Sequence, residues 1–535
     1  MLQTIRSSHG MAVAPNALAA QSALSVLRDG GNAIEAMVAA AATIAVAYPH
    51  MNGIGGDSFW LILPPSDKPM GAPLAIDACG PAAAAASIAA YRARGLDRIP
   101  TRGPLAMNTV AGTVGGWQQA LAVSGRLGGR LPLSRLLADA IGYADEGIPV
   151  TVSQASATAQ KRAELEALPG FADSFLPNGQ VPQAGSRFKQ PKMGRTLAQL
   201  ARDGLDSYYR GALAREIAED FKAVGALLSL EDLAAFHPRE CAPLSVELQC
   251  GMAFNMVPPT QGVVSLAILA LLERAGIEQV AADSADHIHL CVEATKQAFK
   301  LRDAYVTDPA EMLLDPAALL EAGRLAALAA GIELGTALPW GGKSKSGDTV
   351  WMGTVDKNGL AVSFIQSIYH EYGSGVVLPG TGINWQNRGS SFSLERDHLL
   401  ALKPGKKPFH TLNPAAARLK DGRVMVYGTM GGDGQPQTQA AVFSRYVWFK
   451  QELQRAVSAP RWLLGRTWGQ SSDTLKLEAR FDSAIADDLR GRGHEVDILR
   501  DFDETMGHAG AIVRGADGIL QGAADPRSDG CVAGY

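Results

Sequence analysis

The organisation of the chain follows from residues 346–359, which read Ser346-Gly347-Asp348-Thr349-Val350-Trp351-Met352-Gly353-Thr354-Val355-Asp356-Lys357-Asn358-Gly359. A polar lead-in is followed by an alternating strand and an Asn-Gly turn, which is a strong signal for a hairpin. We expect the second strand at 360–368, before the small residues Gly373-Ser374-Gly375. On these residues alone, an ordinary edge hairpin after an exposed loop is favoured. The alternative is that Thr349 becomes a new N-terminus and serves as a catalytic nucleophile.

Composition places the chain among globular proteins. It has 535 residues, of which 47% are apolar and 19% are charged, so it can bury a core larger than that of one small domain. The formal net charge of −4 provides no basic footprint of the kind that nucleic-acid-binding proteins carry. We therefore expect no nucleic-acid partner.

The cysteines and apolar runs bear on the compartment. The chain has five scattered cysteines, Cys79, Cys241, Cys250, Cys291 and Cys531, and no two of them form a Cys-x-x-Cys pair. This pattern favours buried thiols over a disulfide framework or a zinc ribbon. Residues 1–10 lack the basic start and apolar core of a signal peptide. The longest apolar run, from Ala36 to Tyr48, is too short to span a bilayer. We expect a soluble, cytoplasmic protein without a membrane partner.

The texture of the chain changes near Thr349. Helical spacing predominates before it, with helices expected at 16–28, 33–48, 109–128, 133–146, 212–221, 263–272 and 286–305. Strands predominate after it, at 350–355, 360–368, 412–418, 423–428, 473–478 and 510–514, with one further helix at 437–450. This order predicts α and β layers around one shared core. The polar segment Lys343–Asp348 is expected to be exposed and to be a place where the chain is cut.

Two apparent motifs are set aside. His287 and His289 lie two apart on an expected helix, so their side chains face different sides and cannot bind one metal together. Gly342-Lys343-Ser344 looks like the end of a phosphate-binding loop, but Ala337 stands where the first glycine belongs and no strand precedes it. We expect neither a metal nor a cofactor.

Taken together, several short motifs resemble the γ-glutamyltransferase family of N-terminal-nucleophile hydrolases over nearly the whole chain. Their order and spacing carry the resemblance: Gly30-Gly31-Asn32-Ala33, Gly53-Ile54-Gly55-Gly56-Asp57, Asp348-Thr349, Asp356-Lys357-Asn358-Gly359, Gly373-Ser374-Gly375, Gly431-Gly432, Ala459-Pro460-Arg461-Trp462, Ala524-Asp525-Pro526-Arg527-Ser528 and Gly534-Tyr535. The resemblance implies a four-layer αββα sandwich made as a proenzyme and cut between Asp348 and Thr349. The products would be a large subunit, 1–348, and a small subunit, 349–535, which stay together and share one core.

The family's chemistry suits the residue types. A threonine hydroxyl is a poor nucleophile unless a base stands beside it, and the freed α-amine of Thr349, with an ordinary pKa near ~8, can supply that base. Before cleavage the same hydroxyl can attack the Asp348 carbonyl. The resemblance implies that the backbone N–H groups of Gly431 and Gly432 form the oxyanion hole. It also implies that the Ser367 hydroxyl forms a hydrogen bond with the nucleophile.

The sequence departs from the family where γ-glutamyl enzymes hold the amino-acid part of the substrate. Asp77 stands near the place of the family arginine, and Ser391 replaces the acidic residue that holds the α-amine. Arg388 is a new guanidinium in the substrate loop, able to bind a carboxylate through two hydrogen bonds. Further substrate contacts are expected from residues that also differ from the family pattern or flank this loop, namely Asn387, Tyr369, His410 and Thr411.

These departures favour a small acid that carries an amide and no α-amino group. The patterns 368–375 and 386–389 resemble the subgroup that contains oxamate amidohydrolase of purine-ring catabolism. The leading hypothesis is therefore a self-processing threonine amidohydrolase acting through an acyl-enzyme that water or an amine resolves. The alternatives are γ-glutamyl transfer or glutathione hydrolysis, a glutaryl-type cephalosporin acylase, and an unprocessed carboxylate-binding protein. The sequence leaves open whether the processed heterodimer dimerises further.

Overall fold

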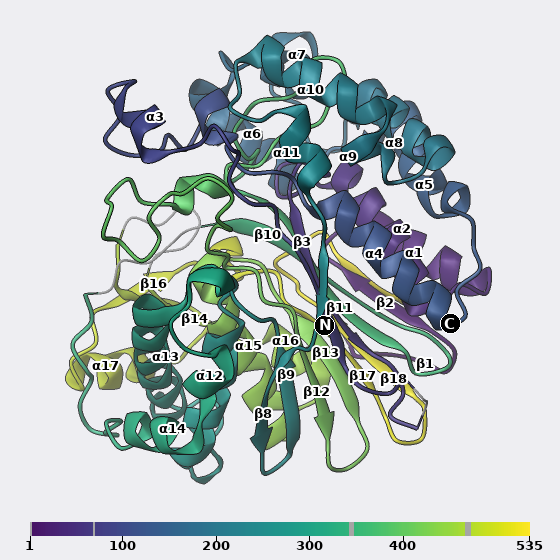
Figure 1. Cartoon of the computed structure of the whole chain (residues 1–535). Coiled ribbons are helices and arrows are strands. Elements are labelled where there is room, and N and C mark those ends of the chain that lie inside the picture. The colour runs from purple at the N-terminus through teal and green to yellow at the C-terminus, as the bar shows by residue number, and fades with distance from the viewer. Residues whose placement is uncertain (1–2, 68–69, 342–346, 466–471) are drawn as a thin grey trace.

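The computed structural model describes residues 3–67, 70–341, 347–465 and 472–535. Two large antiparallel sheets lie at its centre, and helices cover the outer face of each (Figure 1). The result is the four-layer αββα sandwich that the resemblance implied. The helix-rich and strand-rich parts of the sequence do not form separate domains, because each sheet draws strands from both sides of Thr349.

The first sheet contains the predicted hairpin. Its seven strands, in spatial order, are β19 (Cys531–Gly534), β2 (Met11–Ala14), β10 (Asp348–Val355), β11 (Ala361–Tyr369), β3 (Asp57–Leu63), β4 (Leu74–Ala78) and β7 (Arg239–Cys241). The hairpin strands β10 and β11 pair from Val355↔Ala361 to Asp348↔Tyr369 and are flanked by β2 and β3. The hairpin is therefore central, its second strand is buried throughout and, of its described side chains, only those of the turn at Lys357-Asn358 are exposed, so the edge hairpin favoured from its own residues is wrong.

The second sheet faces the first. Its seven strands, in spatial order, are β1 (Ile5–Ser7), β18 (Leu520–Ala524), β17 (Gly510–Arg514), β13 (Val424–Gly428), β12 (Ala415–Leu419), β9 (Gly251–Asn255) and β8 (Leu244–Leu248). Apolar side chains from both sheets pack together between them, including Phe59, Trp351 and Ile512. The Trp351 ring fits against Gly353, Gly428 and Gly510, where an added Cβ would lie 2.2–2.9 Å from ring atoms.

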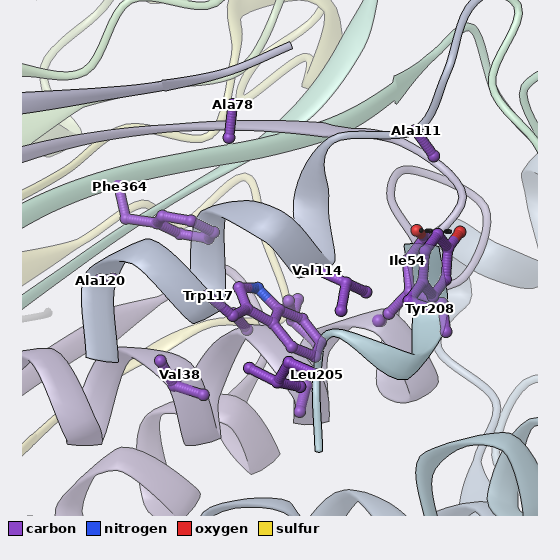
Figure 2. Packing of buried hydrophobic residues seen from close by; sticks show 14 of the residues in the cluster. Val38, Ile54, Ala78, Ala111, Val114, Trp117, Ala120, Leu205, Tyr208 and Phe364 are labelled. Carbon is purple, nitrogen blue, oxygen red and sulfur yellow. Dashed lines mark hydrogen bonds between the residues drawn. The ribbon is translucent and has the colours of Figure 1, made fainter. Parts of the chain in front are cut away.

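One helical layer covers the first sheet. It is built mainly from α1 (Ala17–Arg28), α2 (Ala33–Ala47), α4 (Thr113–Arg126), α5 (Leu133–Glu146), α8 (Pro191–Asp203) and α10 (Ala212–Val224). Helix α2 is buried on all sides, and a capping box between Asn32 and Glu35 satisfies its first N–H groups. In Figure 2, Trp117 of α4 lies among Val38, Val114 and Leu205. Its indole N–H donates to Gln366 of β11 at 3.3 Å, which ties the helix layer to the hairpin.

A second helical layer covers the other sheet (Figure 1). It consists of α12 (Gly262–Arg274), α13 (Ala285–Tyr305), α14 (Ala322–Ala329), α15 (Gln435–Phe443) and α16 (Leu453–Ser458). The smaller elements are α3 (Ile88–Arg92), α6 (Val152–Leu165), α7 (Phe171–Phe175), α9 (Ser207–Arg210), α11 (Leu230–Ala235), α17 (Ser483–Gly491), a ribbon of β5 (Ile148–Pro149) with β6 (Arg187–Phe188), and a small sheet of β14 (Trp462–Leu464), β15 (Leu475–Glu478) and β16 (Val496–Leu499).

Most predicted elements are present with small shifts at their ends. The helix expected at 109–128 begins only at Thr113, and the helix expected at 437–450 begins at Gln435 and turns into a π-helix at Ser444–Trp448. The phosphate-loop-like residues 342–344, and most of the segment predicted to be exposed, lie outside the described residues. Gly347, the next-to-last residue of that segment, is buried, so the predicted exposure is wrong at this position. Among the described residues, no helix combines the length and the apolar character needed to cross a bilayer.

Candidate active site

Thr349 lies at an irregularity in the β10–β11 ladder. Asp348 pairs with Tyr369 and Val350 pairs with Gln366, so the single residue Thr349 stands opposite both Ser367 and Ile368. Such a bulge redirects side chains and is common beside active sites. Thr349 is fully buried in the intact chain. The structure thus places the predicted nucleophile opposite the predicted hydroxyl partner Ser367.

The turn after β11 surrounds this bulge. The Ser367 hydroxyl accepts a hydrogen bond from the Tyr369 N–H at 2.8 Å. Tyr369 has a φ of 83°, a left-handed conformation that is costly for a bulky residue and is found mainly at functional sites. The glycines before β3 permit this packing, because a Cβ on Gly56 would lie 2.1 Å from the Ser367 carbonyl oxygen. The glycine cluster at 53–56 therefore serves close packing.

The predicted oxyanion glycines occupy a constrained loop after β13. Gly431 and Gly432 have φ values of 112° and 53°, which glycine adopts readily. The Gly431 carbonyl accepts from the Gly434 N–H at 2.8 Å, and the Gly432 carbonyl accepts from the Gln261 side chain at 2.9 Å. These bonds fix the 431–432 peptide, which carries the Gly432 N–H, and the 432–433 peptide that follows it.

Arg388 is buried, although a loop arginine is usually exposed. Its side chain is 1% exposed, and its guanidinium carbon lies 3.8 Å from the centroid of the Tyr369 ring. No described residue accepts a hydrogen bond from its three guanidinium nitrogens. Burial lowers the pKa of Arg388 to about 10, with Tyr369 and Asp57 opposing the shift, so the group stays cationic at neutral pH. A buried cation without acceptors is costly, which indicates a place for an anionic ligand.

Tyr369 also connects Arg388 to the predicted cleavage point. A Cβ on Gly347 would lie 2.8 Å from the Tyr369 ring and 3.6 Å from the Thr411 hydroxyl. The same ring thus contacts the residue before Asp348 and the guanidinium of Arg388. The Thr411 hydroxyl is buried and has no hydrogen-bond partner among the described residues.

Asn387 holds the loop rather than pointing an unused amide into the site. Its Oδ1 accepts from the His370 N–H at 3.1 Å, and its Nδ2 donates to the Thr101 carbonyl at 2.8 Å. Its own N–H donates to the Ile368 carbonyl at 3.2 Å. These bonds attach Arg388 to the end of β11.

Asp57, for which the sequence predicted no role, lies beside His410, one of the predicted substrate contacts. Asp57 Oδ2 is 3.2 Å from His410 Nε2, a contact whose alignment is too poor for a good hydrogen bond, and both side chains are fully buried. Asp57 Oδ1 accepts from the N–H groups of Gly80 at 3.1 Å and Gly112 at 2.9 Å. Burial raises the pKa of Asp57 to about 7 and keeps the pKa of His410 well below its ordinary value. The sequence signal that could have indicated a role for Asp57 is its position, directly after a glycine turn and at the start of a buried strand.

The two positions that depart from the family pattern have ordinary structural contacts. The buried carboxylate of Asp77 lies 2.7 Å from Lys407 Nζ and 3.7 Å from Arg239, which accounts for its charge. The Ser391 hydroxyl donates to the Phe409 carbonyl at 3.4 Å. Asp77 is thus paired within the protein and Ser391 is uncharged, so neither takes over the substrate contact that the family residue at its position makes.

A cluster with metal-binding residue types lies away from this site. His289, Glu293 and His494 bring one ligand atom each within 4.8 Å of one another, whereas His287 bonds to Ser444 instead. Each atom already has a protein partner: His289 Nδ1 and His494 Nε2 lie 2.9 Å apart, and Glu293 Oε1 accepts from Lys296 Nζ at 2.7 Å. The ammonium of Lys296 supplies the positive charge that a metal would bring.

Comparison with known proteins identifies the family. The family model described as gamma-glutamyltranspeptidase matches residues 19–535. The chain belongs to this family. It is 61% identical over 530 residues to the "Oxamate amidohydrolase proenzyme" of Klebsiella pneumoniae subsp. pneumoniae, covering 99% of both chains. It is 37% identical to the "Glutathione hydrolase-like YwrD proenzyme" of Bacillus subtilis, covering all of both chains.

Solved structures of gamma-glutamyltranspeptidase relatives share the architecture. The structure of a cephalosporin acylase from Bacillus halodurans matches with a TM-score of 0.90 and 34% identity, covering 100% of this chain and 97% of that one. The chain is therefore an N-terminal-nucleophile hydrolase that acts on C–N bonds. The predicted family, the predicted αββα fold and the predicted enzyme class are confirmed.

Proposed function

We propose that this chain is a self-processing amidohydrolase whose Thr349 attacks the amide of a small carboxylic acid, with oxamate as the leading substrate. The observation that carries the proposal is Arg388, a cation that is 1% exposed and lacks any acceptor among the described residues. A substrate carboxylate would satisfy it through two parallel hydrogen bonds. The relative with 61% identity is named an oxamate amidohydrolase proenzyme, which supports the same substrate class.

The proposed reaction uses two chemical steps at one hydroxyl. Thr349 Oγ attacks the amide carbon while the α-amine of the same residue takes the hydroxyl proton. The N–H groups of Gly431 and Gly432 stabilise the oxyanion, and ammonia leaves with the transferred proton. Water then opens the acyl ester, releasing the acid and restoring the hydroxyl. Ser367, opposite Thr349 in the bulge, is proposed to orient the nucleophile.

Maturation is proposed to use the same hydroxyl. Thr349 Oγ attacks the carbonyl carbon of Asp348, the peptide nitrogen becomes the new α-amine, and water hydrolyses the ester between the two pieces. Segments 1–348 and 349–535 would remain associated, because both sheets contain strands from each segment. We place the enzyme in the cytoplasm, a proposal supported by five cysteines that are all free thiols.

Two other substrates remain candidates within the same chemistry. The structural similarity to a cephalosporin acylase favours a longer mono-amide of a dicarboxylic acid, in which Arg388 binds the distal carboxylate. A γ-glutamyl substrate would need a partner for its α-amine, and Ser391 carries no charge to provide one. His410 and Thr411 are proposed as additional polar contacts for whichever acid binds.

The test combines processing with a substrate panel. A denaturing gel and N-terminal sequencing should show a fragment that begins at Thr349 in the wild type and no such fragment in Thr349→Ala. Ammonia release should be faster from oxamate than from glutaramate, and p-nitroaniline release from a γ-glutamyl anilide should be slow or absent. An intact, inactive wild-type chain, or amide hydrolysis by Thr349→Ala, would contradict the proposal.

A further inference from the structure

One glutamine side chain ties together two loops of the candidate active site. Gln261 is fully buried and lies directly before α12. Its Nε2 donates to the Thr411 carbonyl at 2.9 Å and to the Gly432 carbonyl at 2.9 Å. Both amide hydrogens are therefore used, and they join a loop that carries a predicted substrate contact to the loop that carries the predicted oxyanion donors.

The backbone around Gln261 strengthens the connection to the 410–411 segment. The Gln261 N–H donates to the His410 carbonyl at 2.9 Å, and the His410 N–H donates to the Pro259 carbonyl at 2.9 Å. Residues 259–261 therefore pair with His410 through their backbone. The Gln261 side chain adds the hydrogen bond to Gly432.

An arginine from the outer helix layer supports this arrangement. Arg302 of α13 is 3% exposed, and its Nη1 lies 2.9 Å from Asp433 Oδ1 and 3.4 Å from Gln261 Oε1. Its guanidinium also lies over the Phe299 ring at 4.0 Å. Arg302 thus contacts both Asp433, which follows Gly432, and Gln261, which bonds to Gly432.

A glycine pair needs such external support. Gly431 and Gly432 have no side chains, and both adopt positive φ values where glycine moves freely. Oxyanion stabilisation depends on donors that are already oriented before charge develops, so a loop that can rotate loses most of its effect. Gln261 fixes the carbonyl of Gly432 relative to Thr411, whose hydroxyl lies beside the segment that enters β10.

We propose that Gln261 is a positioning residue that holds the Gly431–Gly432 loop at a fixed orientation relative to Thr411 and the nucleophile. This inference rests on the proposed function, because it takes the two glycines as the oxyanion donors. It assigns Gln261 an effect on the transition state and little effect on ground-state substrate binding. The residue acts through backbone groups and does not itself contact the substrate.

The test compares Gln261→Leu and Gln261→Glu with Gln454→Leu. Gln454 is a matched control, because it is 3% exposed and its Nε2 also donates two hydrogen bonds, to Ser458 and to Ala524. Loss of one oxyanion donor lowers kcat by roughly 10²–10³, so displacement of the pair should lower kcat for oxamate by at least about tenfold. We expect KM to stay within about threefold in both Gln261 variants, and kcat to be unchanged in Gln454→Leu.

Processing gives an independent readout. If the Gln261 variants stay uncut while Gln454→Leu matures, the half-life of precursor cleavage replaces kcat, and the inference requires slowing of about tenfold or more. Wild-type kcat in a processed Gln261 variant overturns the inference, as does an equal loss in the Gln454 control. A variant that is uncut because it unfolds at lower temperature than the control also overturns it. Failure of the wild type to be cut at Thr349 would instead overturn the proposed function.

Discussion

The guanidinium of Arg388 lies over the ring of Tyr369, with 3.8 Å between the guanidinium carbon and the ring centroid. The ring contacts the cation without accepting its N–H groups, which have no acceptor among the described residues and remain available for a carboxylate that binds through two hydrogen bonds. Tyr369 itself is held by Ser367 and adopts a positive φ. The proposed anion site is therefore built onto the end of the strand that faces the nucleophile.

Replacing Arg388 by lysine should weaken substrate binding more than catalysis. Lysine keeps the charge and loses the planar pair of donors, and hydrogen bonds to charged groups contribute about 1.5–3 kcal/mol. We expect KM for oxamate to rise by roughly 10- to 100-fold with a smaller change in kcat. Steady-state kinetics would show this. Arg202→Lys, at a position whose side chain is 69% exposed, should leave both constants unchanged.

The aromatic face of Tyr369 should matter more than its hydroxyl. Tyr369→Phe keeps the flat surface beneath Arg388, so KM should change by no more than about twofold. Tyr369→Leu removes that surface and a cation–π contribution of roughly 0.5–2 kcal/mol, so KM should rise by several-fold. Phenylalanine and leucine are both strained at the φ of 83°, which makes them a fair pair. Equal KM values for the two variants would contradict this role.

Asp57 should make stability fall as pH rises. Burial raises its pKa to about 7, above the ordinary value of 3.8, so between about pH 4 and 7 the folded protein holds a proton that the unfolded chain has lost. Stability therefore decreases with pH across this window. Asp57→Asn has no such proton. Thermal unfolding should show that the free energy of unfolding of the variant, relative to that of the wild type, rises by up to a few kcal/mol from pH 4 to 8.

A surface acid provides a control with the opposite sign. Hydrogen bonds from Arg423 lower the pKa of Asp421, so its contribution to stability is present at neutral pH and is lost as the carboxylate is protonated in acid. Asp421→Asn should lose a little stability at pH 7 and nothing at low pH. A pH-independent difference between wild type and Asp57→Asn would show that Asp57 is not the titrating group.

Packing between the sheets should be sensitive to a single methyl group. A Cβ on Gly428 would lie 2.2 Å from Cδ1 of Trp351, two residues beyond Thr349, so Gly428→Ala must displace the ring. We expect a loss of about 1–3 kcal/mol in chemical denaturation and slower precursor cleavage. Gly142→Ala is the matched control: it lies inside helix α5 with open space around the new carbon, and should gain about 0.5–1 kcal/mol.

The sequence predicted the architecture more fully than the site. The Asn358-Gly359 turn and the alternation around Trp351 were enough to predict the hairpin, because both signals are local. Its central position was missed, since the strands that flank it, β2 and β3, lie hundreds of residues earlier in the chain. The bulge at Thr349 also depends on pairing between strands, which no local pattern reports.

The site shows the same division. Resemblance pointed to Thr349, Gly431 and Arg388 as residues, but not to the burial of Arg388 or its lack of acceptors. Asp57 and Gln261 were passed over because their importance comes from contacts with residues 410–432, far away in sequence. A carboxylate or an amide in the sequence gives no sign of what it will face after folding.

The alternation of early and late strands has a consequence for how the protein is made. Residues 11–14 pair on one side with 353–355 and on the other with 531–534. During synthesis, β2 must therefore wait until residue 355 before its first neighbour is complete, and for nearly the whole chain before its second neighbour exists. The first few hundred residues therefore emerge from the ribosome with unpaired strand edges. We expect folding to be late, slow and assisted by chaperones, with nucleophile and oxyanion loop brought together only in its final stage.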